Sequence, residues 1–265
     1  MKGRVLKKNK WFVIQKPKQN PKARLICFPY AAGNASTYQE WHNNISDDIE
    51  IISIQPPGRA NRILEEPIDN MQELVGELLK YASDLTHIPY FLFGHSLGSR
   101  VGYEFTVQLQ KLGYPMPMHF IASGSRAPHL ASNKRHIHNL PLKEFVIELR
   151  KLSGTPEEIL QNDELIELLL PLLRADFKIA ENYRTKKYLL TCPITVLGGI
   201  DDIGVPKDSL EAWGELTHLG VTVLNIEGGH FFVESERASV LDAINSIISK
   251  QVFELPNLYL ASSVV

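Results

Sequence analysis

The stretch Tyr90-Phe91-Leu92-Phe93-Gly94-His95-Ser96-Leu97-Gly98 decides the fold of this chain. Its first four residues are apolar and predict a buried strand, and the segment from Leu97 onward has the period of a helix. Between them, Gly94 to Gly98 matches the pattern G-x-S-x-G, in which a serine stands on a tight turn from a strand into a helix. Side chains at Gly94 and Gly98 would crowd the neighbouring strand and helix. The stretch therefore predicts a nucleophilic serine, Ser96, above the edge of a sheet.

Composition narrows the class of protein. With 265 residues and 44% hydrophobic content, the chain can bury a large core, and we expect one domain over residues 1–265. The net charge of −2 gives no sign of a nucleic-acid surface. No apolar run approaches the roughly 20 residues of a membrane helix, and the run at 11–14 is too short for a signal peptide. Because two cysteines indicate no disulfide framework, a cytoplasmic location is expected.

Short apolar runs alternate with longer amphipathic segments along most of the chain. This alternation predicts an α/β fold with a mostly parallel central sheet and helices on both faces. The expected strands are residues 24–28, 50–54, 90–93, 119–122, 194–197 and 221–224. The expected helices are residues 70–84, 97–112, 207–219 and 236–248.

One segment, residues 140–187, interrupts the alternation because its pattern is helical throughout. Pro171 is expected to kink or split the last helix of this segment. A helical insertion between two strands is where a lid over the site is expected. The alternative is a helical subdomain that only adds stability.

A serine hydroxyl needs a base to become a nucleophile, and in this strand–turn–helix setting an acid and a histidine follow the serine in chain order. His230 is the candidate base, since Gly228-Gly229-His230 comes directly after the last expected strand. The loop after residues 194–197 supplies two adjacent candidate acids, Asp201 and Asp202. Only one of the two carboxylates can meet the imidazole ring.

The oxyanion formed when the serine attacks needs backbone donors. The N–H of Leu97 opens the helix after Ser96 and is the first candidate donor. A second donor is expected from the loop at residues 28–35, which follows an early strand and carries small residues. The alternative for this loop is an ordinary turn before a helix.

Several segments together resemble the type II, stand-alone thioesterases of nonribosomal peptide and polyketide synthases, which have the α/β-hydrolase fold. The family commonly has F-P-x-A-G-G in the early loop, L-P-G-R after the next strand, G-G-D-x-D-P-x-V in the acid loop and G-H-F-F around the histidine. This resemblance covers roughly residues 25–248. The segments that carry it are Phe28-Pro29-Tyr30-Ala31-Ala32-Gly33, Pro56-Pro57-Gly58-Arg59, residues 93–98, Leu170 to Phe177, Gly198 to Val205, and Gly229-His230-Phe231-Phe232.

The resemblance implies a Ser96–His230–Asp202 triad, since the last aspartate of the acid-loop pattern falls on Asp202. It also implies an oxyanion hole made of the N–H groups of Ala31 and Leu97. The expected reaction is hydrolysis of aberrant or stalled acyl groups from the phosphopantetheine arm of carrier proteins. No cofactor beyond that arm is implied, and the protein is expected to be a monomer. The departures from the family pattern are Tyr30 for histidine, Ala32 for glycine and Ile203 for proline.

Three alternatives stay open. A carboxylesterase or lipase shares the fold and the triad, so these residues alone do not exclude it. An acyltransferase or cyclising thioesterase would use the same acyl-enzyme but release it to another nucleophile. A catalytically inactive carrier-binding protein would need none of the three triad side chains.

Overall fold

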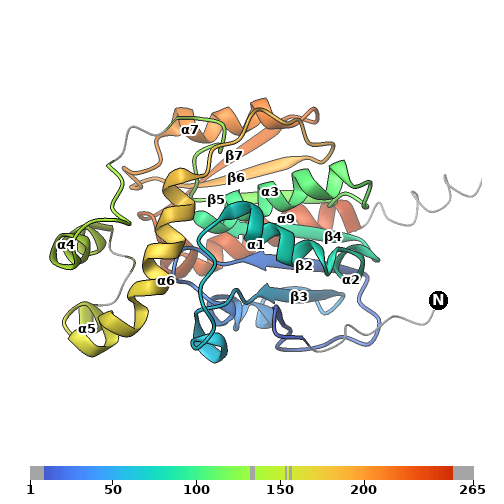
Figure 1. Ribbon diagram of the computed structural model, residues 1–265. Coiled ribbons are helices and arrows are strands. Elements are labelled where there is room, and N and C mark those ends of the chain that lie inside the picture. The colour runs from blue at the N-terminus through green and yellow to red at the C-terminus, as the bar shows by residue number, and fades with distance from the viewer. Residues whose placement is uncertain (1–8, 132–134, 153, 155–156, 253–265) are drawn as a thin grey trace, which may run out of the picture.

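The computed structural model describes residues 9–131, 135–152, 154 and 157–252. Within these residues a seven-stranded sheet has the order β1-β3-β2-β4-β5-β6-β7, and every neighbouring pair is parallel except β1 with β3. The expected mostly parallel sheet is therefore confirmed (Figure 1). The strands are β1 (Phe12–Val13), β2 (Ala23–Phe28), β3 (Ile49–Ile54), β4 (Tyr90–His95), β5 (His119–Ser123), β6 (Ile194–Gly199) and β7 (Val221–Ile226).

The edge strand β1 was not expected from the sequence. It is two residues long, and Phe12 pairs with Ile54 of β3 in antiparallel register. Two residues are too few to show the alternation that identifies a strand.

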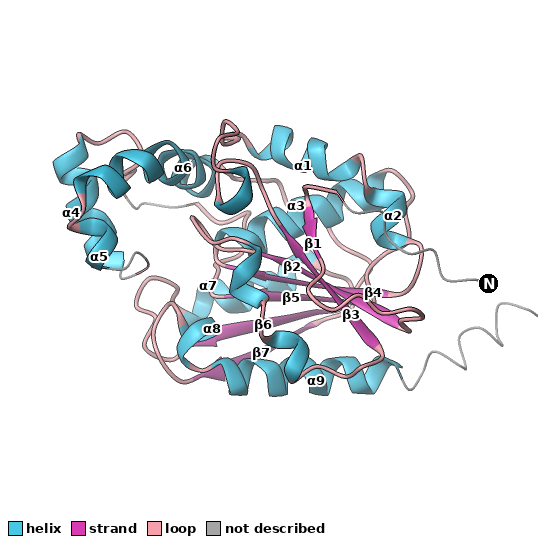
Figure 2. Cartoon of the chain, turned by 90° about the horizontal axis from the view of Figure 1, so that it is seen from below, coloured by secondary structure: helices cyan, strands magenta, loops and turns pink. Residues whose placement is uncertain are grey.

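Helices cover both faces of the sheet, as predicted (Figure 2). One face packs on α1 (Met71–Leu79), α2 (Ala82–Thr86), α3 (Leu97–Lys111) and α7 (Lys207–Glu211), and the other on α9 (Arg237–Val252), which follows the short α8 (Phe232–Ser235). The expected helix at 70–84 is split into α1 and α2, and the one at 207–219 passes from α7 into a 3-10 turn. No described helix is long and apolar enough to span a bilayer.

The insertion contains α4 (Leu142–Leu152), α5 (Glu157–Leu160) and α6 (Asp163–Asn182). In Figure 1, α4 and α5 project beyond the sheet, while α6 runs back alongside it. Helix α6 continues through Pro171, so of the two expected effects of this proline the split is wrong, and the kink stays a prediction. The insertion has a small core of its own, separate from the two cores of the sheet: Ile137, Leu140, Phe145, Leu149, Leu160, Ile166 and Leu173. Its function as a lid stays a prediction.

The turn between β4 and α3 leaves no space for side chains at its two glycines. A Cβ atom on Gly94 would lie 2.3 Å from the carbonyl oxygen of Gly98. One on Gly98 would lie 2.2 Å from the carbonyl oxygen of Phe28 on β2. Because backbone atoms cannot move aside as side chains can, the end of β2 and the start of α3 approach this closely only when residue 98 is glycine.

We expect Gly98→Ala to lower the free energy of unfolding by more than about 2 kcal/mol, since the added methyl group overpacks backbone against backbone. Gly76→Ala is the matched control, because its Cβ atom meets nothing within 4 Å on the exposed side of α1. This control is expected to stabilise the protein by about 0.5–1 kcal/mol through helix propensity. Urea denaturation of both variants measures the two effects, and equal stabilities would contradict the close approach.

Candidate active site

Ser96 lies at the junction of β4 and α3, with φ 54° and ψ −114°. This left-handed conformation is uncommon for a residue with a side chain and stores strain that the surroundings must hold. The N–H of Ser96 donates to the carbonyl oxygen of Ser123 on β5 at 2.7 Å, and that same oxygen accepts from Ser99 Oγ at 2.9 Å. The neighbouring strand and the first turn of the helix therefore fix the turn that presents Ser96.

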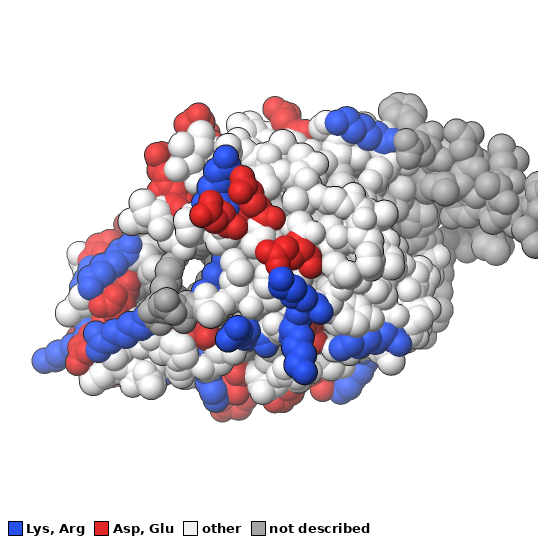
Figure 3. All heavy atoms as spheres, turned by 90° about the horizontal axis from the view of Figure 1, so that it is seen from above, with Lys and Arg blue, Asp and Glu red and all other residues white. Residues whose placement is uncertain are grey.

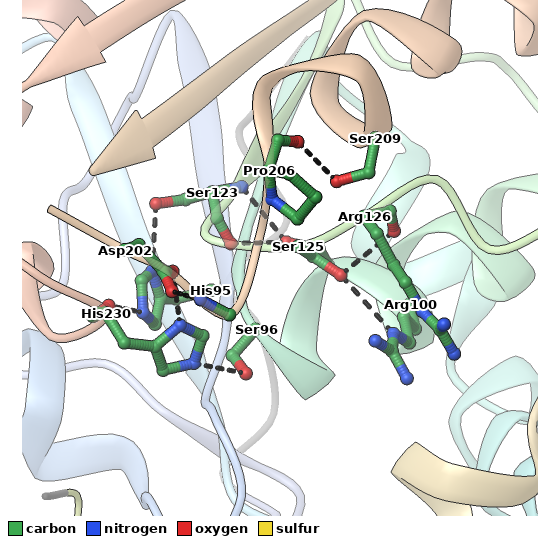
Figure 4. Close-up of polar contacts among 12 residues, drawn as sticks. His95, Ser96, Arg100, Ser123, Ser125, Arg126, Asp202, Pro206, Ser209 and His230 are labelled. Atoms are coloured by element: carbon green, nitrogen blue, oxygen red, sulfur yellow. Dashed lines mark hydrogen bonds and ion pairs between the residues drawn. The ribbon is translucent and has the colours of Figure 1, made fainter. Parts of the chain in front are cut away.

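His230 reaches Ser96 from the loop after β7. Its Nε2 lies 2.9 Å from Ser96 Oγ, and its Nδ1 lies 2.6 Å from Asp202 Oδ2 (Figure 4). An ionised carboxylate only accepts hydrogen bonds, so Nδ1 carries the proton and Nε2 is left to accept from the serine hydroxyl. In this tautomer the imidazole can take the proton of Ser96.

The structure separates the two candidate acids. Asp202 is buried, with 8% of its surface exposed, and Gly204 N–H donates to its second oxygen at 2.9 Å. Asp201 is exposed, and its backbone N–H donates to Gly228. The geometry thus brings Asp202, and not Asp201, onto the imidazole of His230.

His95, inside the G-x-S-x-G turn, connects the turn at Ser96 to the loop of His230. This connection was not predicted from the sequence. His95 Nε2 faces the carbonyl oxygen of His230 at 2.9 Å, and its Nδ1 faces Ser123 Oγ at 2.9 Å. Since a carbonyl oxygen accepts, Nε2 carries the proton and Nδ1 accepts from the serine hydroxyl. Complete burial lowers the pKa of His95 to about 3, so the ring stays neutral and keeps both hydrogen bonds.

The loop after β2 forms a tight turn beside Ser96. Gly33 N–H donates to the carbonyl oxygen of Tyr30 at 2.9 Å, and Ala32 has φ 62°. A positive φ at the third residue alone is the signature of a type II turn, where glycine is usual. An alanine in this conformation costs roughly 1–2 kcal/mol. The family pattern has glycine at this position, so the departure at Ala32 carries a conformational cost.

The two expected oxyanion donors lie in this turn and at the start of α3. Ala31 is the second residue of the type II turn, and Leu97 is the first residue of the helix. Backbone N–H groups in the first turn of a helix have no acceptor within the helix and can point at an anion. Their function as oxyanion donors stays a prediction.

A buried ion pair binds the backbone of this turn. Arg59, which follows Pro57-Gly58, binds Asp176 of α6 through two contacts of 2.9 Å each. Asp176 Oδ2 also accepts from Ala32 N–H at 2.7 Å, and Arg59 donates to the carbonyl oxygen of Gly33 at 3.0 Å. The two residues are separated by 117 positions, so sequence patterning alone did not pair them.

A cavity with a mainly apolar lining lies between this turn and the helices on one face of the sheet. Pro29, which precedes the turn, and Leu97 of α3 line this cavity, while Arg59 and Asp176 provide its charged wall. The other lining residues are Phe28, Ile54, Pro56, Ile68, Leu74, Leu78 and Val101.

Among the described residues, one group of side chains has the composition of a metal site. Ligand atoms of His136, His138 and Glu181 lie within 4.8 Å of one another. The carboxylate of Glu181 already accepts from Ile137 N–H at 2.7 Å and binds the ring of His138. These contacts anchor the start of the insertion to the end of α6.

The family model of the thioesterase domain matches residues 23–251. This chain belongs to the thioesterase family. Gramicidin S biosynthesis protein GrsT of Aneurinibacillus migulanus is 40% identical over 88% of this chain and 92% of its own length.

Two solved structures are similar to this thioesterase throughout. The type II thioesterase BorB from the borrelidin biosynthetic cluster is 31% identical, with a TM-score of 0.83 over 92% of this chain and 99% of its own. ClbQ from the colibactin NRPS/PKS pathway is 32% identical, with a TM-score of 0.81 over 86% of this chain and 98% of its own. The predicted α/β-hydrolase fold, the resemblance to type II thioesterases and the thioester hydrolase activity are confirmed.

The low pKa of His95 predicts how the stability of this thioesterase depends on pH. The folded pKa, about 3, lies below the ordinary value of 6.5, so the unfolded chain binds a proton first as the pH falls. The stability that the neutral ring of His95 contributes to the folded state is therefore complete above pH 6.5 and is lost between pH 6.5 and 3. Over this range the His95 ring should make the free energy of unfolding rise by about 1.4 kcal/mol per pH unit, which corresponds to one proton. We expect His95→Gln to remove this rise.

Urea denaturation of the wild type and His95→Gln between pH 4 and 8 measures this slope. Above pH 7.5 the two proteins should change in parallel, which serves as the internal control. Parallel curves below pH 6 as well would show that His95 is protonated in the folded protein.

Proposed function

We propose that this thioesterase removes aberrant or stalled acyl groups from the phosphopantetheine arm of carrier proteins in a nonribosomal peptide or polyketide pathway. Ser96 is the nucleophile, His230 the general base and acid, and Asp202 the residue that orients the imidazole. The observation that carries the proposal is the 2.9 Å contact between Ser96 Oγ and His230 Nε2 in a chain of the thioesterase family. The pathway assignment is supported by the similarity to GrsT, BorB and ClbQ.

Acylation begins when His230 Nε2 takes the proton of Ser96 Oγ. The oxygen attacks the carbonyl carbon of the thioester, and the N–H groups of Ala31 and Leu97 hold the resulting oxyanion. Each such donor is typically worth about 3–4 kcal/mol in the transition state. Collapse of the intermediate breaks the C–S bond, and the pantetheine thiol departs with the proton from His230. Asp202 stabilises the imidazolium while this proton is held.

Deacylation repeats the same steps with water. His230 Nε2 takes a proton from a water molecule, whose oxygen attacks the ester carbonyl of acyl-Ser96. The same two N–H groups hold the second oxyanion. Collapse breaks the bond to Ser96 Oγ, which recovers its proton from His230, and the free acid leaves.

The insertion is assigned the function of a lid that shapes the acyl pocket and the channel for the pantetheine arm. Helix α6 contributes Asp176 to the wall of the cavity beside Leu97, so the insertion already forms part of the surroundings of the site.

We further propose that the protein acts in the cytoplasm as a monomer. Acidic and basic side chains are interspersed over the face shown in Figure 3, with no unbroken basic area there for a nucleic acid.

Ser96→Ala is expected to abolish release of acyl groups from acyl-carrier proteins while leaving the fold intact, since the nucleophile is lost and the side chain loses only one oxygen. Mass spectrometry of a panel of acyl-carrier proteins measures the release, and the thermal unfolding midpoint checks the fold. Soluble oxygen esters assayed in parallel distinguish a carboxylesterase, which would prefer them. Undiminished release by the variant would contradict the mechanism, and an ester or ring as product would indicate acyl transfer.

Asp202→Asn is expected to lower kcat by about 10⁴-fold, because an amide in place of the carboxylate favours the wrong imidazole tautomer. Asp201→Asn is the matched control, being the same substitution on the neighbouring exposed residue. It should leave kcat within about twofold of the wild type. Steady-state kinetics on one acyl-carrier substrate measures both, and equal losses would show that the acid is misassigned.

A further inference from the structure

The Arg59–Asp176 pair is built more elaborately than a salt bridge that only joins two segments. Arg59 is 4% exposed and Asp176 2%, and both contacts between the guanidinium and the carboxylate measure 2.9 Å. Taking two charges out of water is costly, and replacing a buried ion pair by apolar residues is often neutral or stabilising. A site beside the nucleophile that nevertheless contains such a pair invites a functional explanation.

The pair binds two backbone groups of the turn that carries Ala31. Asp176 Oδ2 accepts from Ala32 N–H at 2.7 Å, and Arg59 Nη1 donates to the carbonyl oxygen of Gly33 at 3.0 Å. Gln55 adds a second link, since its oxygen accepts from Ala35 N–H at 2.9 Å and its nitrogen donates to the carbonyl oxygen of Arg59 at 3.1 Å. The turn is therefore held from the segment after β3 and from helix α6.

The hydrogen bond at Ala32 decides which way the middle peptide of the turn faces. Type I and type II turns differ by reversal of the peptide between the second and third residues. The positive φ of Ala32 places this turn in the less favourable type II form for an alanine. Asp176 accepts the N–H of that peptide, so it selects the type II orientation. Reversal would exchange the Ala31 carbonyl oxygen and the Ala32 N–H between the two sides of the turn. The N–H of Ala31, assigned to the oxyanion, belongs to the preceding peptide and is held in place with the turn as a whole.

We propose that Arg59 and Asp176 are positioning residues for the oxyanion hole, through which helix α6 of the insertion holds in place the turn that carries the Ala31 N–H. This inference rests on the proposed function. The two charges also cancel each other. A lone carboxylate at Ala32 would repel the oxyanion, and Arg59 neutralises it.

A different function for the same pair would be to shape the acyl pocket, because both residues also line the cavity beside Leu97. A pocket residue acts on binding of the acyl chain and therefore on KM and chain preference. A positioning residue of the oxyanion hole acts on the transition state and therefore on kcat. Kinetics thus separates the two.

The test uses two conservative variants of the full chain, Asp176→Asn and Arg59→Lys. Asp176→Asn keeps the shape but breaks the two-contact pairing, while Arg59→Lys keeps the charge but loses the fork that reaches both Asp176 and Gly33. The matched controls are Glu50→Gln and Arg24→Lys. Arg24 Nε and Glu50 form an equally buried pair at 3.0 Å, near the starts of β2 and β3 and away from Ser96.

Four quantities are measured: kcat, KM, the affinity for an alkyl boronic acid, and the affinity for a non-hydrolysable thioether analogue of the acyl-pantetheine. The boronic acid forms a tetrahedral anion on Ser96 and imitates the oxyanion, whereas the thioether imitates the bound ground state. We expect kcat and boronic-acid affinity to fall together by about tenfold to hundredfold in both site variants. KM and thioether affinity should stay within about threefold, and the two controls should keep the wild-type kcat per folded molecule.

Three results would overturn the inference. One is a folded Arg59→Lys protein with unchanged kcat and boronic-acid affinity. Another is a change confined to KM, which would assign the pair to the acyl pocket. The third is an equal loss of kcat in Glu50→Gln or Arg24→Lys, which would make the effect one of stability. Failure of the proposed function is distinct, because there the wild type itself would release no acyl group or Ser96→Ala would stay active.

Discussion

The close approach of β2 to the start of α3 is the constraint on which the rest of the site depends. The carbonyl oxygen of Phe28 lies 2.2 Å from the position that a Cβ atom of residue 98 would occupy, so the end of β2 packs directly against the first turn of α3. The loop after β2 therefore lies beside Ser96. This backbone contact helps to place Ser96 next to the turn that carries Ala31, and the strained φ of Ser96 is its local cost.

Three loops from far apart in the chain then meet at the same edge of the sheet. Parallel strands present their carboxyl ends together, so the loops after β2, β6 and β7 arrive near the end of β4. The ring of His95 joins the loop after β7 to the end of β5, because it binds the backbone of His230 on one side and Ser123 on the other. Helix α6 binds the loop after β2 through Asp176, which accepts a hydrogen bond from Ala32 N–H. The site is thus held by buried polar contacts among segments whose relative places the sheet determines.

The sequence predicted the parts of this thioesterase that have a local signature. The strand before Ser96, the glycines around it and the loop of His230 are each recognisable within a few residues, and the structure places them as expected. Edge strand β1 was missed because two residues show no period. The contacts of His95 and of the Arg59–Asp176 pair were missed because their partners come together only in the folded chain. Asp202 and Asp201 look alike from the residues alone. The family resemblance favoured Asp202, and the contact with His230 and the burial of Asp202 separate the two in the structure.

The separate small core of the insertion has a consequence for motion. Phe145 and Leu160 of α4 and α5 pack in that small cluster and not in either core of the sheet. Segments with their own modest core open with a lower free energy than the global unfolding of the domain. Asp176, by contrast, lies on the part of α6 that is bonded to the body of the protein. Helices α4 and α5 can therefore exchange their amide protons faster than the sheet does, while the contacts around Ser96 persist.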